Sequence, residues 1–355
     1  MKYPAVLNFE TILPALDEFD TIIDARSESE FALDHLPGAI NCPVLDDEQR
    51  ILVGTTYKQV GAFEAKKIGA PLVAKNIARY VETLFADKPK EWKPLVYCWR
   101  GGNRSGSMAL IFAKIGWPVV QLDGGYKAYR AYIATALEDP PALDLRVVCG
   151  TTGSGKTRLL ETLDAIGAQV LDLEGLAAHR GSVLGNLPDA PQPTQKAFES
   201  AIWDRLRRFD ASRPVFVESE SKKVGNLRVP DALMARMRAA PCIRLELDRP
   251  LRVDLLMEDY RHFARDAAAL NGQLEHLVQL HGRARIDAWH EMANEGRMPE
   301  LVDQLLVEHY DPAYLKSIDR NFTQYPQAQV VTLSGIAPDD FLAAARQLHD
   351  GGAEA

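Results

Sequence analysis

A cysteine lies in a short stretch rich in glycine and arginine, Cys98-Trp-Arg-Gly-Gly-Asn-Arg-Ser105. The apolar run 94–97 before it predicts a buried strand, and the apolar spacing of 106–113 after it predicts a helix packed on a sheet. The two glycines allow backbone angles that turn N–H groups inward, and the helix N-terminus adds positive potential. A thiol held there ionises more readily than a free one, and the thiolate is the nucleophile. We therefore expect Cys98 to be catalytic, with anion-binding support from Arg100, Gly101, Gly102 and Arg104.

Two other interpretations of this cysteine deserve comparison. A lone cysteine is commonly a buried core residue, but glycines and arginines make a poor core and suit a phosphate-type cradle. The spacing Cys-x5-Arg also matches the protein-phosphatase signature. Tyr97 stands where those phosphatases usually have a histidine, which argues against that activity.

A second anion-binding motif is Gly150-Thr-Thr-Gly-Ser-Gly-Lys-Thr157. A strand expected at 145–149 precedes it and a helix expected at 158–163 follows, which is the context that a G-x-x-x-x-G-K-T loop requires. ATP is the usual ligand of such a loop, but any pyrophosphate ester presents similar oxygens. Backbone N–H groups would surround the phosphates, the lysine would add a charge and the threonine hydroxyl would face Mg²⁺. The predicted phosphate-binding residues are Gly150, Gly153, Ser154, Gly155, Lys156 and Thr157.

Acidic residues follow two further strands expected at 169–172 and 214–221. Carboxylates at this edge of a P-loop fold often assist a metal ion, so Asp172, Glu218 and Glu220 are candidates for metal assistance. They suit ion pairs with nearby arginine and lysine residues equally well, and we assign no definite metal ligand. No tightly bound cofactor is expected.

The elements that position these motifs alternate between strand and helix, which predicts an α/β fold with parallel sheets. In such sheets ligands lie at the carboxyl ends of the strands, where Cys98 falls. In the first half we expect a strand ending at Asp24, a helix capped by Ser27 with Glu30, and helical stretches at 62–69 and 73–85.

Paired prolines within 138–144 indicate a linker between two domains. We therefore expect a first domain over 1–140 and a second over 141–355, the latter helical from about 251 to 320.

The length, the net charge and the spacing of the cysteines narrow the class of protein. The chain has 355 residues, a net charge of −8 and four widely spaced cysteines. These features indicate free thiols in a reducing compartment and argue against bulk nonspecific binding of nucleic acid. Because the sequence has neither a signal-peptide pattern nor a membrane-spanning run, we expect a cytoplasmic location. We also expect a monomer.

Basic residues of the second half nevertheless cluster near aromatic ones. Such a pattern suits stacked bases of a nucleic acid, although solvated helix faces offset by acids explain the composition better. The residues concerned are Arg205, Arg207, Arg208, Lys222, Lys223, Arg236, Arg238, Arg261, Arg265, Arg283 and Arg285, with Phe209, Tyr260, Phe263 and Trp289.

The first half resembles the rhodanese family. The resemblance rests on Asp24-Ala-Arg-Ser, Glu30-Phe, His35-Leu-Pro-Gly-Ala-Ile-Asn and Leu122-Asp-Gly-Gly-Tyr. It implies a rhodanese-like parallel-sheet domain in which Cys98 takes the place of the persulfide-forming cysteine. The loop is one residue longer than is typical, which predicts a wider cradle. Asp24 and His35 are expected to hold loops together rather than to catalyse.

The second half is similar to the C-terminal domain of the tRNA 2-selenouridine synthase family. The similarity runs through 150–157, 172–182, 191–196, 217–221 and 308–314. It implies a P-loop NTPase-like α/β domain and a transferase acting on wobble 2-thiouridine of tRNA. The base would be geranylated from geranyl diphosphate, and the geranylthio group would then be replaced by selenium from selenophosphate. Cys98 would carry selenium, and the enzyme that produces selenophosphate is a candidate partner.

Three rival functions remain open from the sequence. One is a small-molecule kinase or NTPase with a rhodanese sensor domain, and another is a rhodanese-type sulfurtransferase. The third is a noncatalytic RNA-binding adaptor, which two intact anion loops disfavour.

Overall fold

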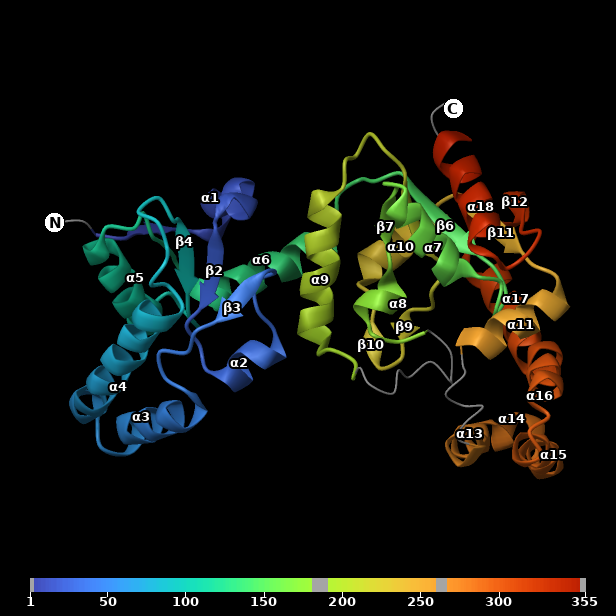
Figure 1. Ribbon diagram of the computed structural model, residues 1–355, viewed down its shortest axis with the longest axis horizontal. Coiled ribbons are helices and arrows are strands. Elements are labelled where there is room, and N and C mark those ends of the chain that lie inside the picture. The colour runs from blue at the N-terminus through green and yellow to red at the C-terminus, as the bar shows by residue number, and fades with distance from the viewer. Residues whose placement is uncertain (1–2, 181–190, 260–266, 352–355) are drawn as a thin grey trace. The chain divides into compact units, whose positions relative to one another are not determined.

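The computed structural model describes residues 3–180, 191–259 and 267–351 (Figure 1). The chain forms two compact units. The first comprises Met1–Glu138 with Pro193–Asp204, and the second comprises Asp139–Gln192 with Arg205–Ala355. The segment Pro193–Asp204, which the sequence analysis placed in the second domain, therefore groups with the first unit.

The first unit is built on a five-stranded sheet in the order β1-β5-β4-β2-β3, in which every pair is parallel. Its strands are short, and the central ones are buried apolar runs as expected for a sheet covered on both faces. They are β1 (Ala5–Leu7), β2 (Thr21–Asp24), β3 (Ala39–Asn41), β4 (Pro94–Tyr97) and β5 (Val120–Leu122).

The helices of the first unit connect these strands. They are α1 (Phe9–Ile12), the 3₁₀ helix η1 (Leu13–Glu18), α2 (Glu28–Leu33), α3 (Asp47–Gln59), α4 (Ala62–Thr83), α5 (Asn103–Ile115) and α6 (Gly125–Glu138). The predicted capping box of Ser27 and Glu30 is present at the start of α2. The two predicted stretches 62–69 and 73–85 form one helix instead, because α4 continues through Pro71 and buries Ala65 and Ile77 on either side of it.

One core cluster of this unit joins the sheet to α4 and α5. Ile23 and Val96 from the strands pack with Ile77 of α4 and Phe112 of α5, and Cys98 belongs to the same cluster. The cysteine loop is therefore fixed on its inner side by the packed core.

The second unit contains a five-stranded parallel sheet in the order β12-β11-β6-β8-β7. The P-loop strand β6 is central, and the acidic strand β8 is its direct neighbour. The strands are β6 (Leu145–Cys149), β7 (Gln169–Leu171), β8 (Val215–Glu218), β11 (Cys242–Glu246) and β12 (Gln329–Thr332). A separate antiparallel pair consists of β9 (Lys223–Val224) and β10 (Leu227–Arg228).

Helices surround this second sheet and then form a helical region, as predicted. Next to the sheet are α7 (Lys156–Ala165), α8 (Leu173–Leu176), α10 (Asp231–Ala239), α11 (Arg249–Asp259) and α18 (Pro338–Gly351). Helix α9 (Gln195–Arg208) belongs to the first unit up to Asp204, and its last turn belongs to the second. The helical region contains α13 (Ala267–Leu274), η2 (Glu275–Leu277), α14 (Val278–His281), α15 (Arg283–Asn294), α16 (Met298–Leu305), the π-helix η3 (Leu306–Tyr310), α17 (Asp311–Asn321) and η4 (Tyr325–Gln327).

The helical region has a hydrophobic cluster of its own. Trp289 is fully buried there among Leu274, Ile286 and Leu301. Among the described residues, no helix has both the length and the apolar character needed to cross a membrane.

Candidate active sites

Cys98 lies directly after β4, and its residue is 3% exposed. Its loop packs against the start of α6, where the Tyr126 N–H donates to the Cys98 carbonyl at 2.8 Å. Gly125 has a φ of +54°, and a Cβ there would lie 2.1 Å from the Cys98 carbonyl oxygen. Gly101 has a φ of +65°, and its Cβ would lie 2.6 Å from the Leu122 carbonyl oxygen. Only glycine fits these two positions without displacing the loop.

Among the described residues, one polar side chain is hydrogen-bonded to the sulfur of Cys98. The Ser105 hydroxyl donates to Sγ at 3.1 Å, and Ser105 is itself fully buried. Gln121 Nε2 donates to that hydroxyl at 3.2 Å and to the Gly101 carbonyl at 2.5 Å. These hydrogen bonds hold the sulfur in a fixed position relative to the loop. Neither Ser105 nor Gln121 was predicted, although Ser105 lies at the end of the motif.

The backbone of this loop offers a run of free donors. Within the described part of the chain, none of the N–H groups of residues 99–105 has a hydrogen-bond acceptor. The last three belong to the first turn of α5, a 13-residue helix, where N–H groups have no intrahelical partner. Consecutive unpaired N–H groups at a helix N-terminus attract an anion. The cysteine is thus placed beside a geometry that suits an oxyanion.

The two arginines predicted to support this cradle differ. Arg100 is exposed and has no ion pair among the residues that the structure describes. Arg104 instead makes an ion pair with Glu30 of α2, at 2.6 Å between Nη1 and Oε2. Although burial raises the pKa of the Glu30 carboxyl, hydrogen bonding and charge from Arg104 outweigh it and bring the pKa below its usual range. Arg104 therefore ties the loop to α2 and offers little uncompensated charge.

Asp24 and His35 have structural contacts, as expected. Asp24 forms a buried ion pair with Arg26 at 2.6 Å, and Arg26 also donates to the Asp34 carbonyl at 2.6 Å. His35 stacks on Phe31 with 3.9 Å between ring centroids. These contacts hold the segment around β2 and α2 in place.

The predicted phosphate loop of the second unit lies between β6 and α7. Gly153 and Gly155 have φ values of +77° and +88°. A Cβ on Gly153 would lie 2.8 Å from Leu256, and one on Gly155 would lie 2.6 Å from Phe341. A Cβ on Gly150 would lie 2.4 Å from Oγ of Ser154. The loop is thus enclosed by α11 and α18 in a form that only these glycines permit.

Lys156 and Thr157, the polar side chains at the end of this loop, make hydrogen bonds to neighbouring groups. Lys156 Nζ donates to the Gly150 carbonyl at 2.7 Å, and Thr157 Oγ1 donates to Glu174 at 3.1 Å. Ser154 is 1% exposed, and its hydroxyl has no partner within the described residues. The lysine therefore occupies loop carbonyls, and a bound phosphate would compete for its ammonium group.

The acidic candidates gather beside the loop but differ in role. Asp172 caps α8 by accepting from the Gly175 N–H at 2.7 Å. Glu218 is 2% exposed, and only one of its oxygens has a partner, the Glu174 N–H at 2.6 Å. Burial and neighbouring carboxylates, Asp172 first among them, raise the pKa of Glu218 well above its usual value.

Glu220 also carries a perturbed carboxyl. Burial and the carboxylate of Glu174 raise the pKa of Glu220 to about 8, despite the opposing charge of Lys156. Glu174 thus lies between Thr157 and the two buried acids, and sequence reasoning did not single it out. The signal that the sequence offered for Glu174 was its position as the third residue of the segment 172–182, which begins with Asp172.

A metal ion at this cluster is consistent with the donor set, but no complete site is preformed. Across 3–180, 191–259 and 267–351, no three His, Cys, Asp or Glu side chains are grouped as metal ligands. Mg²⁺ commonly takes one or two protein carboxylates and completes its octahedron with water and phosphate oxygens. The hydroxyl of Thr157, the Glu174 carboxylate and the unpartnered Glu218 oxygen fit that requirement.

Residues distant in sequence hold the phosphate loop, and none of them was predicted. Arg252 donates two hydrogen bonds to the Thr152 carbonyl, at 2.9 and 2.7 Å. Arg252 also pairs with Asp311 of α17 at 2.6 Å. The hydroxyl of Tyr314 accepts from the Gly150 N–H at 2.7 Å and lies 3.1 Å from the Ser219 hydroxyl. Helices α11 and α17 therefore fix the first part of the loop, at Gly150 and Thr152.

The basic clusters of the second half behave largely as solvated faces. Lys222, Arg236, Arg283 and Arg285 pair with Asp231, Asp139, Glu275 and Glu308 respectively. Trp289, considered as a base-stacking residue, is buried in the helical core because it fills the space between α15 and its neighbours. Tyr260, Arg261, Phe263 and Arg265 lie outside the described residues.

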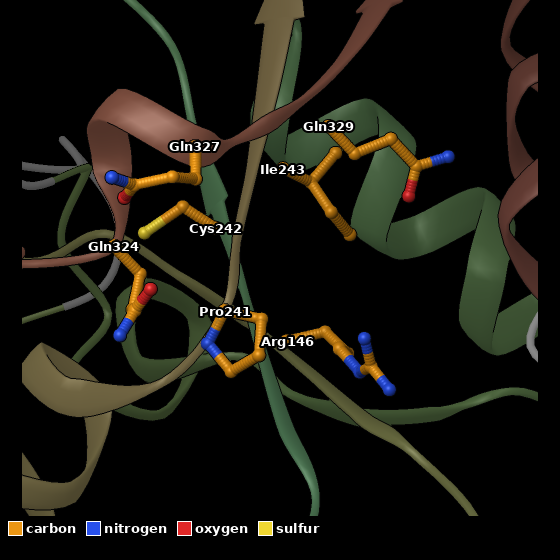
Figure 2. A pocket seen from close by; sticks show the side chains of 7 residues that line it. All are labelled: Arg146, Pro241, Cys242, Ile243, Gln324, Gln327 and Gln329. Atoms are coloured by element: carbon orange, nitrogen blue, oxygen red, sulfur yellow. The ribbon is translucent and has the colours of Figure 1, made fainter. Parts of the chain in front are cut away.

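A hollow of about 210 Å³ lies at the amino ends of β6 and β11, the sheet edge opposite the phosphate loop. Figure 2 shows three glutamine side chains around it, with the Cys242 sulfur on one side. Its lining is Arg146, Pro241, Cys242, Ile243, Gln324, Gln327 and Gln329.

The sequence matches two families over its two halves. Residues 11–132 match the rhodanese-like domain, and residues 143–285 match the tRNA 2-selenouridine synthase AAA domain. The tRNA 2-selenouridine synthase of Nitrosomonas europaea is 36% identical over 261 residues, covering 70% of this chain and 66% of that protein. The synthase of the same name from Hydrogenovibrio crunogenus is 32% identical over 338 residues, covering 85% of this chain and 92% of that protein.

A solved structure is also similar to part of the chain. It is the N-terminal domain of a Clostridium difficile 630 protein described as ATP/GTP binding, with 35% identity and a TM-score of 0.32. The similarity covers 36% of this chain and 98% of that one.

Proposed function

Because this chain belongs to the tRNA 2-selenouridine synthase family, we propose that it replaces the sulfur of wobble 2-thiouridine in tRNA with selenium. One observation supports the proposal: the chain has two separate loops whose geometry suits an anion, of which one contains a cysteine and the other does not. A two-stage reaction on one base needs both a diphosphate leaving group and a selenium-bearing oxyanion. Each loop suits one of those anions.

The first stage is geranyl transfer at the P-loop. The sulfur of the base attacks C1 of geranyl diphosphate, the C–O bond breaks, and pyrophosphate leaves with the electron pair. Charge accumulates on the leaving oxygens, so preorganised N–H groups and Lys156 lower the barrier. Thr157 with Glu174 and Glu218 would hold Mg²⁺, which neutralises part of that charge. ATP hydrolysis has no part in this step.

The second stage takes place at the cysteine loop. The free N–H groups of residues 99–105 bind the oxyanion of selenophosphate beside the Cys98 thiol, which positions the selenium for transfer. The selenium attacks C2 of the geranylated base, the C–S bond breaks, and geranylthiolate leaves with its electron pair. Water then cleaves the P–Se bond, so that phosphate is released and 2-selenouridine remains. Because Cys98 is 3% exposed, the loop must admit the reagent before the selenium is transferred. Substrates enter and leave, and no cofactor stays tightly bound.

The partners follow from this chemistry. The tRNA carrying 2-thiouridine is the macromolecular substrate, and a selenophosphate-producing enzyme is a natural donor partner. We propose a monomer that works in the cytoplasm.

The decisive assay incubates 2-thiouridine tRNA with geranyl diphosphate and selenophosphate and identifies nucleosides by mass spectrometry. Wild type should yield geranylated and then selenated uridine. Cys98→Ala should accumulate the geranylated base, whereas Lys156→Ala should leave 2-thiouridine unchanged. Equal loss of both products in Cys98→Ala would refute the division of labour.

Each rival function predicts a different assay result with the same purified protein. Titration with geranyl diphosphate and with ATP tests the P-loop ligand. Tight ATP binding without competition from geranyl diphosphate, together with steady phosphate release in the absence of tRNA, would support a kinase or NTPase instead. Rapid thiocyanate formation from thiosulfate and cyanide would support a plain sulfurtransferase.

A further inference from the structure

Helices α3 and α4 form a hairpin that covers 47–83 and is joined only by Val60 and Gly61 (Figure 1). Although α3 has 13 residues, it contains no buried residue. Large apolar side chains are exposed near the hairpin tip instead: Phe63 is 74% exposed, Val60 70% and Tyr57 60%. Exposed apolar residues concentrated in one place mark a surface for interaction.

The net charge of the hairpin is opposite in sign to that of the segment before it. The hairpin, 47–83, contains four lysines and two arginines against four acidic residues, whereas residues 1–46 contain two basic and nine acidic residues. Lys58, Lys66 and Lys75 are exposed and have no carboxylate partner among the described residues. Lys67 pairs with Glu64 at 3.2 Å on the surface, where such a pair is weak. The hairpin is therefore a local cationic surface on an acidic chain.

The size and chemistry of this surface favour one class of ligand. A 13-residue helix extends about 20 Å, which exceeds the reach of a small molecule. Aromatic rings interleaved with unpaired lysines suit RNA, because phosphates pair with the ammonium groups while unpaired bases stack on the rings. An acidic protein would also pair with the lysines and pack on Phe63 and Tyr57, but the family's macromolecular substrate is RNA, and the test below separates the two.

The hairpin is also linked to the cysteine loop. Arg50, in the first turn of α3, lies 3.7 Å from Glu30, and Glu30 pairs with Arg104 of the loop at 2.6 Å. The chain of charges Arg50–Glu30–Arg104 thus joins the start of the hairpin to the edge of the oxyanion cradle. The start of α3 is therefore connected through Glu30 to the first turn of α5, which follows Cys98.

We propose that the α3–α4 hairpin is an RNA-binding surface that holds the substrate tRNA while its modified base lies at the cysteine loop. This inference rests on the proposed function, because it takes tRNA as the substrate. Lys58 and Lys66 bind phosphates, and Phe63 with Tyr57 supports stacked bases. The hairpin thereby gives the first unit its own hold on the RNA.

The test uses the full-length protein and a tRNA with 2-thiouridine at the wobble position. Affinity is measured by fluorescence anisotropy over a range of salt concentrations. The double variant Lys58→Glu with Lys66→Glu should lower the slope of log affinity against log salt by about 2, and Phe63→Ala should weaken binding roughly tenfold. The matched control is Lys88→Glu with Lys90→Glu, which makes the same charge change before β4, at the amino edge of the same sheet.

The outcomes separate this inference from the proposed function. Loss of tRNA affinity in the hairpin variants alone, with wild-type circular dichroism and geranyl diphosphate affinity, supports the surface. Unchanged tRNA affinity, or an equal loss in the control, overturns it. Unchanged tRNA affinity with a loss of selenation only when selenophosphate is supplied by its producing enzyme assigns the hairpin to a protein partner and also overturns it. If wild type converts no tRNA at all, the proposed function fails, whatever the hairpin variants bind.

Discussion

Replacement of Arg252 by alanine should loosen the phosphate loop from a distance. The Arg252 side chain is 7% exposed, pairs with Asp311 at 2.6 Å and donates twice to the Thr152 carbonyl. Removing one member of a buried ion pair costs about 3–5 kcal/mol when the other charge stays buried. Because the Asp311 side chain is 24% exposed, water solvates part of the abandoned charge, and we expect a loss of about 2–3 kcal/mol.

The assay combines urea unfolding with amide exchange of the peptide that contains 150–157. Arg252→Ala should unfold at lower urea, exchange faster in the loop and bind inorganic pyrophosphate more weakly. Arg252→Lys keeps the charge but cannot reproduce the forked contacts, so its values should be intermediate. If Arg252→Ala changed neither loop exchange nor pyrophosphate affinity, the idea that α11 and α17 position the P-loop would be wrong.

Three further perturbations have definite expected results. Because the pKa of Glu220 lies at about 8 in the native protein, this carboxyl keeps a proton that the unfolded chain loses near pH 4.5. The free energy of unfolding should therefore fall as pH rises from about 4.5 to about 8, and the melting temperature of Glu220→Gln should depend less on pH over that range. Gly101→Ala should destabilise the first unit by about 1 kcal/mol or more in urea unfolding and slow selenation, whereas Gly102→Ala, whose Cβ meets nothing within 4 Å, should fold like wild type; equal stability of the two would contradict the loop geometry. Glu30→Gln should lower the free energy of unfolding by about 1 kcal/mol at pH 7 and by less near pH 4. The reason is that the pKa of Glu30 is lowered in the native protein, so its ion pair with Arg104 is stabilising above the unfolded pKa of about 4.5 and is lost as pH falls below it. The same loss at both pH values would show that the charge is not responsible.

The sequence was most informative where structure is determined by neighbouring residues. The bounds of β6 agree with the predicted strand 145–149, and the Ser27–Glu30 capping box is present, because both depend on contacts within a few residues. The predicted break near Pro71 did not occur. Proline removes one hydrogen bond and its ring crowds the preceding turn, but the buried face of α4 continues across it and tertiary packing outweighs that cost.

The parts that escaped prediction depend on long-range contacts. Arg252 and Tyr314 lie about 100 and 160 residues from the loop carbonyl and N–H that they bind. Tyr314 ends the segment 308–314 that resembles the family, but no local pattern indicates the contact of either residue with the loop. Trp289 illustrates the opposite error. Trp289 lies near Arg283 and Arg285 in the sequence. In the fold it is a packing residue in the core of the helical region, and composition does not reveal that position.

The cysteine loop and the P-loop would attract anions through different charged and polar groups. In the cysteine loop the charge of Arg104 is already compensated by Glu30, so attraction for an anion must come mainly from backbone N–H groups and from Arg100. In the P-loop a full ammonium charge is present on Lys156, and acids with raised pKa values lie beside it. Protonated acids repel a diphosphate less than ionised ones, so binding there is favoured at neutral pH, and a cation that displaces the protons preserves that balance at higher pH. The first loop thus suits a small oxyanion held close to sulfur, and the second suits a highly charged leaving group, as the proposed two-stage exchange on one base requires.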